Sequence, residues 1–394
     1  MNLLMVARQV MLGLFLLVVA TAVAQAPAPN AGQAAAPARV GPMGPTVVSP
    51  EVMPDRRVTL RIYAPGAQAV TTLLGEPGPT NLVKGSDGVW ETTLGPLAPG
   101  AYRYNFNVDG ATVVDSRNID TERMQVVVRS ILYVPGVAFM DERKVPHGAI
   151  SEVFYYSTVL GKFRSMHVYT PPGYEDGTKQ YPVLYLLHGA NESDDSWHSV
   201  GRAGFILDNL IADGKAVPMI VVMPNGHTDQ TPPSFGGPRQ PGDSPRPQYV
   251  DKFLGEFDTD IMPYAESHYR IFADRSHRAI AGLSMGGSQT LSIAFAHLDR
   301  FSAIGVFSSG VLFGGVDEFE KNHLAALDDA NLKKGLKIVW FSTGADDSLL
   351  PVSKATVAML NRHGINATFK ESAGAHTWIN WRNYFYEFAP QLFR

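Results

Sequence analysis

The sequence predicts an α/β protein with a doubly wound, mostly parallel sheet, preceded by a small β-sandwich. Residues 57–108 contain segments that alternate apolar and polar side chains with period two, which is typical of half-buried antiparallel strands. From about residue 147 the strand-like segments are apolar throughout and are separated by helix-compatible stretches, as expected for a parallel sheet buried on both faces. One of these segments runs directly into the pattern G-x-S-x-G at residues 282–286.

The chain of 394 residues starts with a segment of the kind that is removed on export. Arg8 precedes an apolar run over residues 10–20, and Ala22-Val23-Ala24 has the small-x-small form of a cleavage site. The apolar run is shorter than the roughly 20 residues that a membrane span requires. We therefore expect a signal peptide over residues 1–24, cleaved after Ala24, and a secreted or periplasmic mature protein without a membrane anchor.

A tether and a small domain follow the signal peptide. Residues 25–50 are mostly Ala, Pro and Gly, which bury too little surface to fold. The alternating pattern predicts an immunoglobulin-like β-sandwich over residues 51–135. Tyr102, Tyr104 and Phe106 share one face of a predicted strand and favour a core role over a sugar-binding platform. The alternating segments of this domain are 57–63, 88–94 and 101–108.

Residues 147–394 predict the second domain. Its apolar runs are continuous, and strands of this kind belong in a sheet that is covered on both faces. With the 282–286 turn on one such strand, the α/β-hydrolase fold follows. The other runs are 166–169, 182–187, 219–223, 303–307 and 336–341.

Ser284 lies at the tip of the G-x-S-x-G turn and is the candidate nucleophile. Residues 278–281 read as a strand before the turn and residues 289–298 as a helix after it. Glycine is required at positions 282 and 286 because a Cβ there would collide with the neighbouring strand and helix. The hydroxyl of such a serine is exposed next to a helix N-terminus.

A serine hydroxyl needs a base, so a carboxylate and a histidine are expected later in the chain, in the order Ser, Asp, His. Residues 343–348 follow a strand and contain both Asp346 and Asp347; either is a candidate acid, and the other can cap a helix. His376 lies in a loop between the last strand and a helix. Of its rivals, His297 and His323 fall in helical stretches and His277 precedes the turn. The full set of alternative candidates for the base is His188, His227, His277, His297 and His323.

An anion-binding element is predicted at residues 186–190, Leu-Leu-His-Gly-Ala, where an early strand ends, in addition to the helix N-terminus after Ser284. The main-chain N–H groups of Met285 and Ala190 are expected to face the negative charge that develops on an ester oxygen. His188 is expected to fix this loop by hydrogen bonding.

Four segments together resemble carbohydrate esterase family 1, the feruloyl and acetylxylan esterases, and the resemblance spans nearly all of residues 151–394. It implies that Ser284 is the nucleophile, His376 the general base and Asp347, the fourth position of G-x-x-D-S-L, the orienting acid. It implies no metal or organic cofactor. The segments are 187–189, 282–287, 344–349 and 374–382.

The same resemblance implies that Trp378 and Trp381 pack around the histidine. Trp197 is expected either in the core or as a wall of the pocket. The Pro- and Gly-rich loop at residues 227–249 is expected to form a rim of the acyl or sugar pocket, since long loops in compact domains are usually functional or disordered. Separately, residues 97–110 resemble the early-set, carbohydrate-binding family 48 modules.

The resemblance implies hydrolysis of feruloyl or acetyl esters on plant cell-wall xylan. The alternatives are a siderophore esterase of the enterochelin type, a mycolyltransferase-like acyltransferase and a non-catalytic glycan-binding protein. A net charge of −4 without a basic block argues against nucleic acid and against the anionic catecholates of siderophores. The expected partners are a plant polysaccharide or a small ester, and the acyl group and the oligomeric state stay open.

Overall fold

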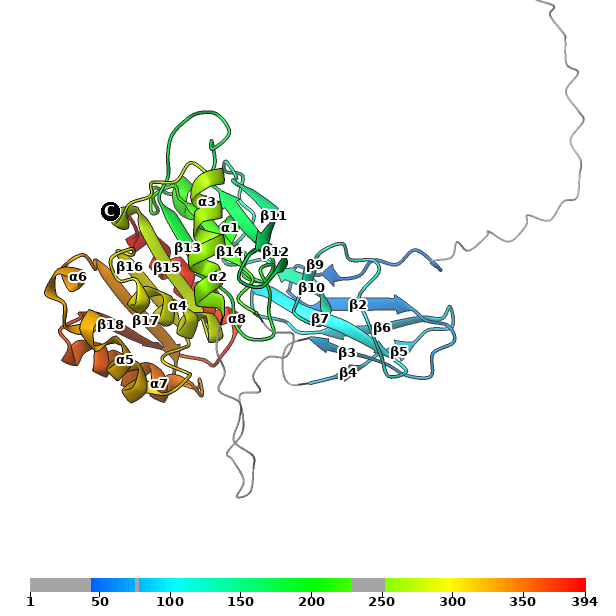
Figure 1. Ribbon diagram of the computed structural model, residues 1–394. Helices are drawn as coiled ribbons and strands as arrows, with labels where there is room; N and C mark the ends of the chain where they lie inside the picture. Colours follow the sequence, from blue (N-terminus) through cyan, green and yellow to red (C-terminus); the bar gives the residue numbers. More distant parts are fainter. Residues whose placement is uncertain (1–43, 75–77, 229–251) are drawn as a thin grey trace, which may run out of the picture. The chain divides into compact units, whose positions relative to one another are not determined.

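The computed structural model describes residues 44–74, 78–228 and 252–394 (Figure 1), and residues 46–394 form one compact unit. The predicted signal peptide, most of the tether and most of the 227–249 loop lie outside the described residues. Among the described residues, no helix has the length and the apolar character that a membrane crossing demands.

The first predicted domain contains two antiparallel sheets, in the strand orders β1-β2-β6-β5 and β4-β3-β7-β10-β9, with β8 paired to β7. This arrangement is consistent with the predicted sandwich. Tyr104 and Phe106 are buried in its core as predicted, and Tyr102 is half-buried. The strands are β1 (Glu51–Val52), β2 (Val58–Tyr63), β3 (Val70–Leu74), β4 (Thr80–Asn81), β5 (Val83–Lys84), β6 (Val89–Leu94), β7 (Gly100–Val108), β8 (Ala111–Val113), β9 (Thr121–Arg123) and β10 (Val128–Val134).

The second predicted domain contains an eight-stranded sheet in the order β11-β12-β14-β13-β15-β16-β17-β18. β12 pairs antiparallel with β11 and β14, and all other pairs are parallel. The predicted mostly parallel sheet is therefore confirmed. The strands are β11 (Ala149–Ser157), β12 (Lys162–Thr170), β13 (Val183–Leu187), β14 (Ile220–Pro224), β15 (Arg278–Leu283), β16 (Ala303–Phe307), β17 (Ile338–Gly344) and β18 (Ala367–Ser372).

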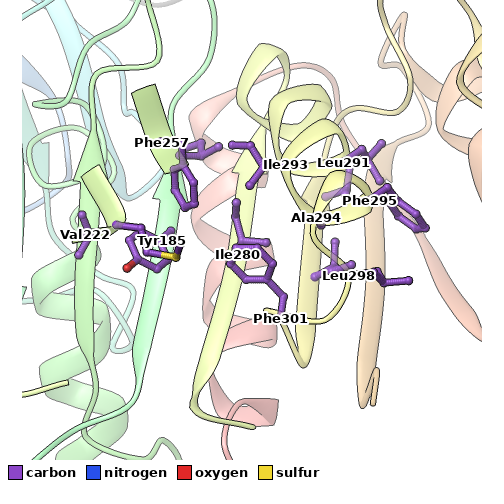
Figure 2. Close-up of a cluster of buried hydrophobic side chains, with 14 of the residues drawn as sticks. Tyr185, Val222, Phe257, Ile280, Leu291, Ile293, Ala294, Phe295, Leu298 and Phe301 are labelled. Atoms are coloured by element: carbon purple, nitrogen blue, oxygen red, sulfur yellow. The ribbon is translucent and has the colours of Figure 1, made fainter. Parts of the chain in front are cut away.

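Helices cover both faces of this sheet (Figure 1). On one face, side chains of α2, the π-helical turn η1, α3, α4, α5 and α7 form a buried cluster with alternate strand residues such as Tyr185 and Ile280. Figure 2 shows the part of this cluster that η1 and α4 contribute. On the other face, α1 and α8 pack against Leu184 and Ala279. The helices are α1 (Ala203–Ala212), α2 (Phe253–Glu256), η1 (Phe257–Ile261), α3 (Met262–His268), η2 (Arg275–His277), α4 (Met285–Ala296), α5 (Val316–Asp328), α6 (Ala330–Lys334), α7 (Leu350–Arg362), α8 (Trp378–Phe388) and η3 (Ala389–Gln391).

The strand order reverses at β13, whose successor β14 lies on one side of it while β15 lies on the other. Open α/β sheets bind ligands at such a reversal, beyond the carboxyl ends of the strands. Segments that follow β13, β15, β17 and β18 contain Ala190, Ser284, Asp347 and His376. The fold therefore collects the predicted site residues at one edge of the sheet.

The two predicted domains share a core. Ala101 and Ile131 of the sandwich belong to the same buried cluster as Trp197 and Phe385. The buried guanidinium of Arg382, in α8, donates to the carbonyl oxygen of Ala101 at 3.1 Å and to that of Val200 at 2.9 Å. The sandwich is thus packed against the second domain by apolar contacts and by hydrogen bonds.

Candidate active site

Ser284 adopts the strained backbone expected at the tip of the turn between β15 and α4. Its φ and ψ are 51° and −119°, and a non-glycine residue held in a sparsely populated region of this kind costs about 1–3 kcal/mol. The packing enforces this turn. A Cβ on Gly282 would lie 2.4 Å from the carbonyl carbon of Gly286, and one on Gly286 would lie 2.4 Å from the carbonyl oxygen of His188. Both glycines are therefore needed, as the sequence predicts.

His376 lies between Ser284 and Asp347. Its Nε2 is 3.0 Å from Ser284 Oγ, and its Nδ1 is 2.9 Å from Asp347 Oδ2. An ionised carboxylate only accepts hydrogen bonds, so this network assigns the ring proton to Nδ1. Nε2 is then free to accept the hydroxyl proton of Ser284, which is the arrangement that activates a serine.

Of the two adjacent aspartates, Asp347 is the one in contact with His376. Its side chain is fully buried, and its Oδ1 accepts a hydrogen bond from the main-chain N–H of Leu349 at 2.9 Å. Burial acts to raise the pKa of Asp347, but the hydrogen bonds from His376 and Leu349 outweigh it and hold the pKa below its usual range. Asp346 is exposed. The geometry favours the aspartate that the family resemblance selects.

Ala190 and Met285, the two residues predicted to bind the oxyanion, lie close to the nucleophile. Met285 directly follows Ser284 and begins α4, and Ala190 lines the same cavity as Ser284 and His376. Neither N–H donates a hydrogen bond within the described part of the chain. Because the start of a helix also carries a partial positive charge, the two groups are available to an anion at this position.

A cavity of about 330 Å³ opens beside Ser284. This volume lies at the lower end of the range for small-molecule sites. Leu283, Leu349 and Trp381 contribute apolar side chains to its lining. The described residues that line it are Gly189, Ala190, Asn191, Glu192, Leu283, Ser284, Ser348, Leu349, His376 and Trp381.

Comparison with known proteins decides the family. A sequence profile described as "Putative esterase" matches residues 157–392, which is more than half of the chain. The chain belongs to this esterase family. The predicted enzyme class, a carboxylic ester hydrolase, and the resemblance to carbohydrate esterase family 1 are thereby confirmed.

Relatives of this esterase include feruloyl esterases. It is 32% identical over 363 residues to the endo-1,4-beta-xylanase/feruloyl esterase of Xylanibacter ruminicola, which covers 88% of the chain and 46% of that relative, so the chain spans less than half its length. A family CE1 ferulic acid esterase from Anaeromyces mucronatus in complex with ferulic acid is 26% identical with a TM-score of 0.53, covering 66% of the chain and 96% of that structure.

A second similar structure is the enterobactin esterase from Shigella flexneri. The sequences are 16% identical and the TM-score is 0.56, covering 85% of the chain and 92% of that structure. This likeness concerns the fold alone. Both similar structures agree with the α/β-hydrolase fold predicted for this esterase.

The other histidines of the esterase have different surroundings. Buried His188 donates from Nδ1 to the carbonyl oxygen of Gly189 at 2.8 Å, and its Nε2 accepts from the N–H of Gly226 at 2.8 Å. Burial lowers the pKa of His188 and lowers that of His227 to about 3. His188 therefore fixes the loop after β13, as expected from its place in the sequence.

The predicted tryptophans pack close to His376. The ring of Trp381 makes an edge contact with the imidazole at 4.9 Å between centroids, and Trp378 makes one with Trp381 at 5.2 Å. Trp197 is buried and donates from Nε1 to the carbonyl oxygen of Leu187 at 3.0 Å. Of its two expected roles, Trp197 takes the one in the core.

Two groups of side chains in the described residues could hold a cation: His167, Asp195 and His198, and Glu152, His167 and Asp194. Their members already form imidazole–carboxylate pairs, with 3.0 Å from His167 Nδ1 to Asp194 Oδ2 and 2.8 Å from His198 Nε2 to Asp195 Oδ1. None of these five residues is among the described residues that line the cavity.

Glu192 is a cavity-lining residue that sequence reasoning missed. It follows Gly189 by three positions, and its Oε2 accepts the main-chain N–H of that glycine at 3.1 Å. Its Oε1 accepts from Trp378 Nε1 at 2.8 Å. An acidic residue shortly after the predicted anion-binding loop was the available signal, but its partner Trp378 lies 186 positions away in the chain.

Proposed function

We propose that this chain is a secreted serine esterase that removes feruloyl groups from plant cell-wall xylan. The alternative substrate is an acetyl group on the same polysaccharide. The observation that carries the proposal is the line of hydrogen bonds from Ser284 through His376 to Asp347 at the edge of an apolar-walled cavity. The names of its relatives, which include feruloyl esterases, support the choice of substrate.

In the proposed reaction, Ser284 Oγ attacks the ester carbonyl carbon while His376 Nε2 takes the hydroxyl proton. The N–H groups of Ala190 and Met285 hold the oxyanion, and each is worth on the order of 100- to 1000-fold in rate. Collapse of the tetrahedral intermediate breaks the bond to the sugar oxygen, which receives the proton from His376, and leaves the acyl group on Ser284.

The second half of the reaction uses the same groups. A water molecule gives a proton to His376 Nε2 and attacks the acyl-enzyme, and the carboxylic acid leaves as Ser284 recovers its proton. Asp347 keeps the proton of the imidazole on Nδ1 throughout and stabilises the imidazolium that forms in each half. The buried, hydrogen-bonded carboxylate has the depressed pKa that this role requires.

The size of the cavity favours an aromatic acyl group. A space of about 330 Å³ accommodates a small aromatic ligand, whereas an acetyl group would leave most of it to water. Burying an aromatic ring against Leu283, Leu349 and Trp381 is worth about 2–3 kcal/mol, which an acetyl group forgoes.

The test is kcat/KM of the purified enzyme on methyl ferulate and on acetylated xylan, with Ser284→Ala as the blank. We expect turnover of methyl ferulate that Ser284→Ala abolishes. Release of acetate without turnover of the ferulate would identify an acetylxylan esterase. No turnover of either ester would reject the proposed substrate and favour a siderophore ester or acyl transfer to a sugar.

The proposed export rests on the signal peptide predicted at residues 1–24. Expression of the full chain in a bacterial host should give a protein outside the cytoplasm whose N-terminus is Gln25. An intact Met1 in the purified protein would contradict cleavage after Ala24.

A further inference from the structure

The β-sandwich holds the loop that contains Ala190. We call residues 189–197, which follow β13, the oxyanion loop. Six residues of this loop form hydrogen bonds with the loop and strands of the sandwich around β7 and β9. The bonds are Gln125 N–H to Asn191 O at 3.3 Å, Arg103 to Glu192 Oε1 at 3.1 Å, Ser193 Oγ to Arg123 O, Arg123 Nη2 to Asp194 Oδ2 at 3.4 Å, Arg123 N–H to Asp195 Oδ2 at 2.6 Å, and Ser196 Oγ to Glu122 Oε1 at 2.6 Å.

Arg103 and Glu192 form the centre of this contact. Arg103 lies on β7, and its guanidinium donates to Glu192 Oε1, which also accepts from Trp378 Nε1. The other oxygen, Oε2, accepts from Gly189 N–H. One carboxylate thus joins the sandwich, the residue before Ala190 and the first residue of α8, two positions after His376.

The contact between the oxyanion loop and the sandwich depends on the positive charge of Arg103, because its two carboxylate partners are buried. The guanidinium also donates from Nε to Glu122 Oε2 at 2.6 Å, and the side chains of Glu122 and Glu192 are only 0% and 6% exposed. Burial acts to lower the pKa of Arg103, but the charges of Glu192 and Glu122 outweigh it and raise that pKa. Without the guanidinium, two buried carboxylates would lose the cation between them, which strongly destabilises such a group.

We propose that the β-sandwich is part of the catalytic unit and that Arg103 is a positioning residue, which fixes the N–H of Ala190 through Glu192. This inference rests on the proposed function, in which that N–H holds the oxyanion. An oxyanion exists in the transition state and not in the bound ester, so a displaced donor lowers kcat and leaves KM nearly unchanged.

The test compares Arg103→Met with Arg61→Met in the full chain. Arg61 is a matched control, because it lies in the same sandwich, contacts the carboxylates of Glu51 and Glu91, and has a side-chain exposure of 21% against 20% for Arg103. Two readouts are measured: hydrogen exchange of the peptide that contains residues 188–197, and kcat and KM on methyl ferulate.

We expect Arg103→Met to speed exchange in the oxyanion loop at least tenfold and to lower kcat about 10- to 100-fold, a large part of the value of one oxyanion donor, with KM within about twofold. Arg103→Lys should recover part of kcat, since it restores the charge but not the paired geometry. Arg61→Met should change neither readout, even where it lowers the melting temperature.

Unchanged loop exchange and unchanged kcat in Arg103→Met would overturn the inference. So would an equal loss of kcat in Arg61→Met, because the effect would then be general to the sandwich. Should Arg103→Met fail to fold, Glu192→Gln provides the same comparison from the other side of the contact. If the wild type hydrolyses no ester, the proposed function fails, whereas the exchange rates still decide whether Arg103 holds the loop.

Discussion

Asp347→Asn separates the roles of two adjacent aspartates. In the wild type, Asp347 Oδ2 accepts a hydrogen bond from the N–H at His376 Nδ1, at 2.9 Å. An asparagine can present its NH₂ group there, so Nδ1 must accept and the ring proton moves to Nε2, which faces Ser284 Oγ at 3.0 Å. The imidazole then cannot take the hydroxyl proton. We expect kcat to fall about 10⁴-fold, or about 5.5 kcal/mol of transition-state stabilisation.

The assay is hydrolysis of methyl ferulate at saturating substrate, followed by absorbance, with circular dichroism to show that each variant is folded. Asp346→Asn is the matched control. Asp346 is exposed, and its contact with Gly374 is made by the main-chain N–H at 3.0 Å, so kcat should stay within about twofold, as for surface substitutions. A loss under tenfold in Asp347→Asn, with a large loss in Asp346→Asn, would refute the assignment.

Three further outcomes follow from the site. Gly286→Ala should lower the unfolding free energy by about 3 kcal/mol or more, because the new Cβ meets a carbonyl oxygen at 2.4 Å. In the control Gly177→Ala, the new Cβ meets no atom of the described chain within 4 Å, so the unfolding free energy should change by no more than about 0.5 kcal/mol. Equal melting temperatures of the two variants would contradict this prediction. Because the pKa of Asp347 is lowered in the folded state, the ionised carboxylate stabilises the fold fully above its ordinary pKa of 3.8, and this stabilisation is lost as the pH falls through the lower folded value. In urea titrations, the difference in unfolding free energy between wild type and Asp347→Asn should therefore shrink below about pH 4. A difference that stays constant with pH would contradict this prediction. Leu349→Trp should fill the cavity and reduce kcat/KM on methyl ferulate about tenfold or more, while the rate of acetate release changes little. Equal losses of kcat/KM on both esters would show that Leu349 does not border the acyl site.

Sequence reasoning found the parts of the site that local patterns encode. The strained turn at Ser284 needs small residues on both sides, so its glycines are visible in the sequence, and the close contacts of Gly282 and Gly286 explain why. His376 follows from chain order and from its place after the last strand. The buried strands β13, β14 and β16 were visible as continuous apolar runs because both of their faces are covered.

Features that depend on tertiary contacts were not predicted from residue pattern. Asp346 and Asp347 differ in burial, which adjacent positions in a polar turn do not show. β11 is an edge strand that is mostly exposed, so it lacks the apolar run used to find the other strands. Arg103 and Glu192 are 89 positions apart, and their contact exists only once the sandwich packs against the second domain.

The most direct test of the account is labelling of the active enzyme with an organophosphonate that mimics the tetrahedral intermediate, followed by peptide mapping and an assay on methyl ferulate. If Ser284 is the nucleophile, each chain gains one adduct, on Ser284, and ester hydrolysis is lost in proportion to labelling. An adduct on another residue, or an enzyme that still hydrolyses the ester while Ser284 is blocked, would contradict it.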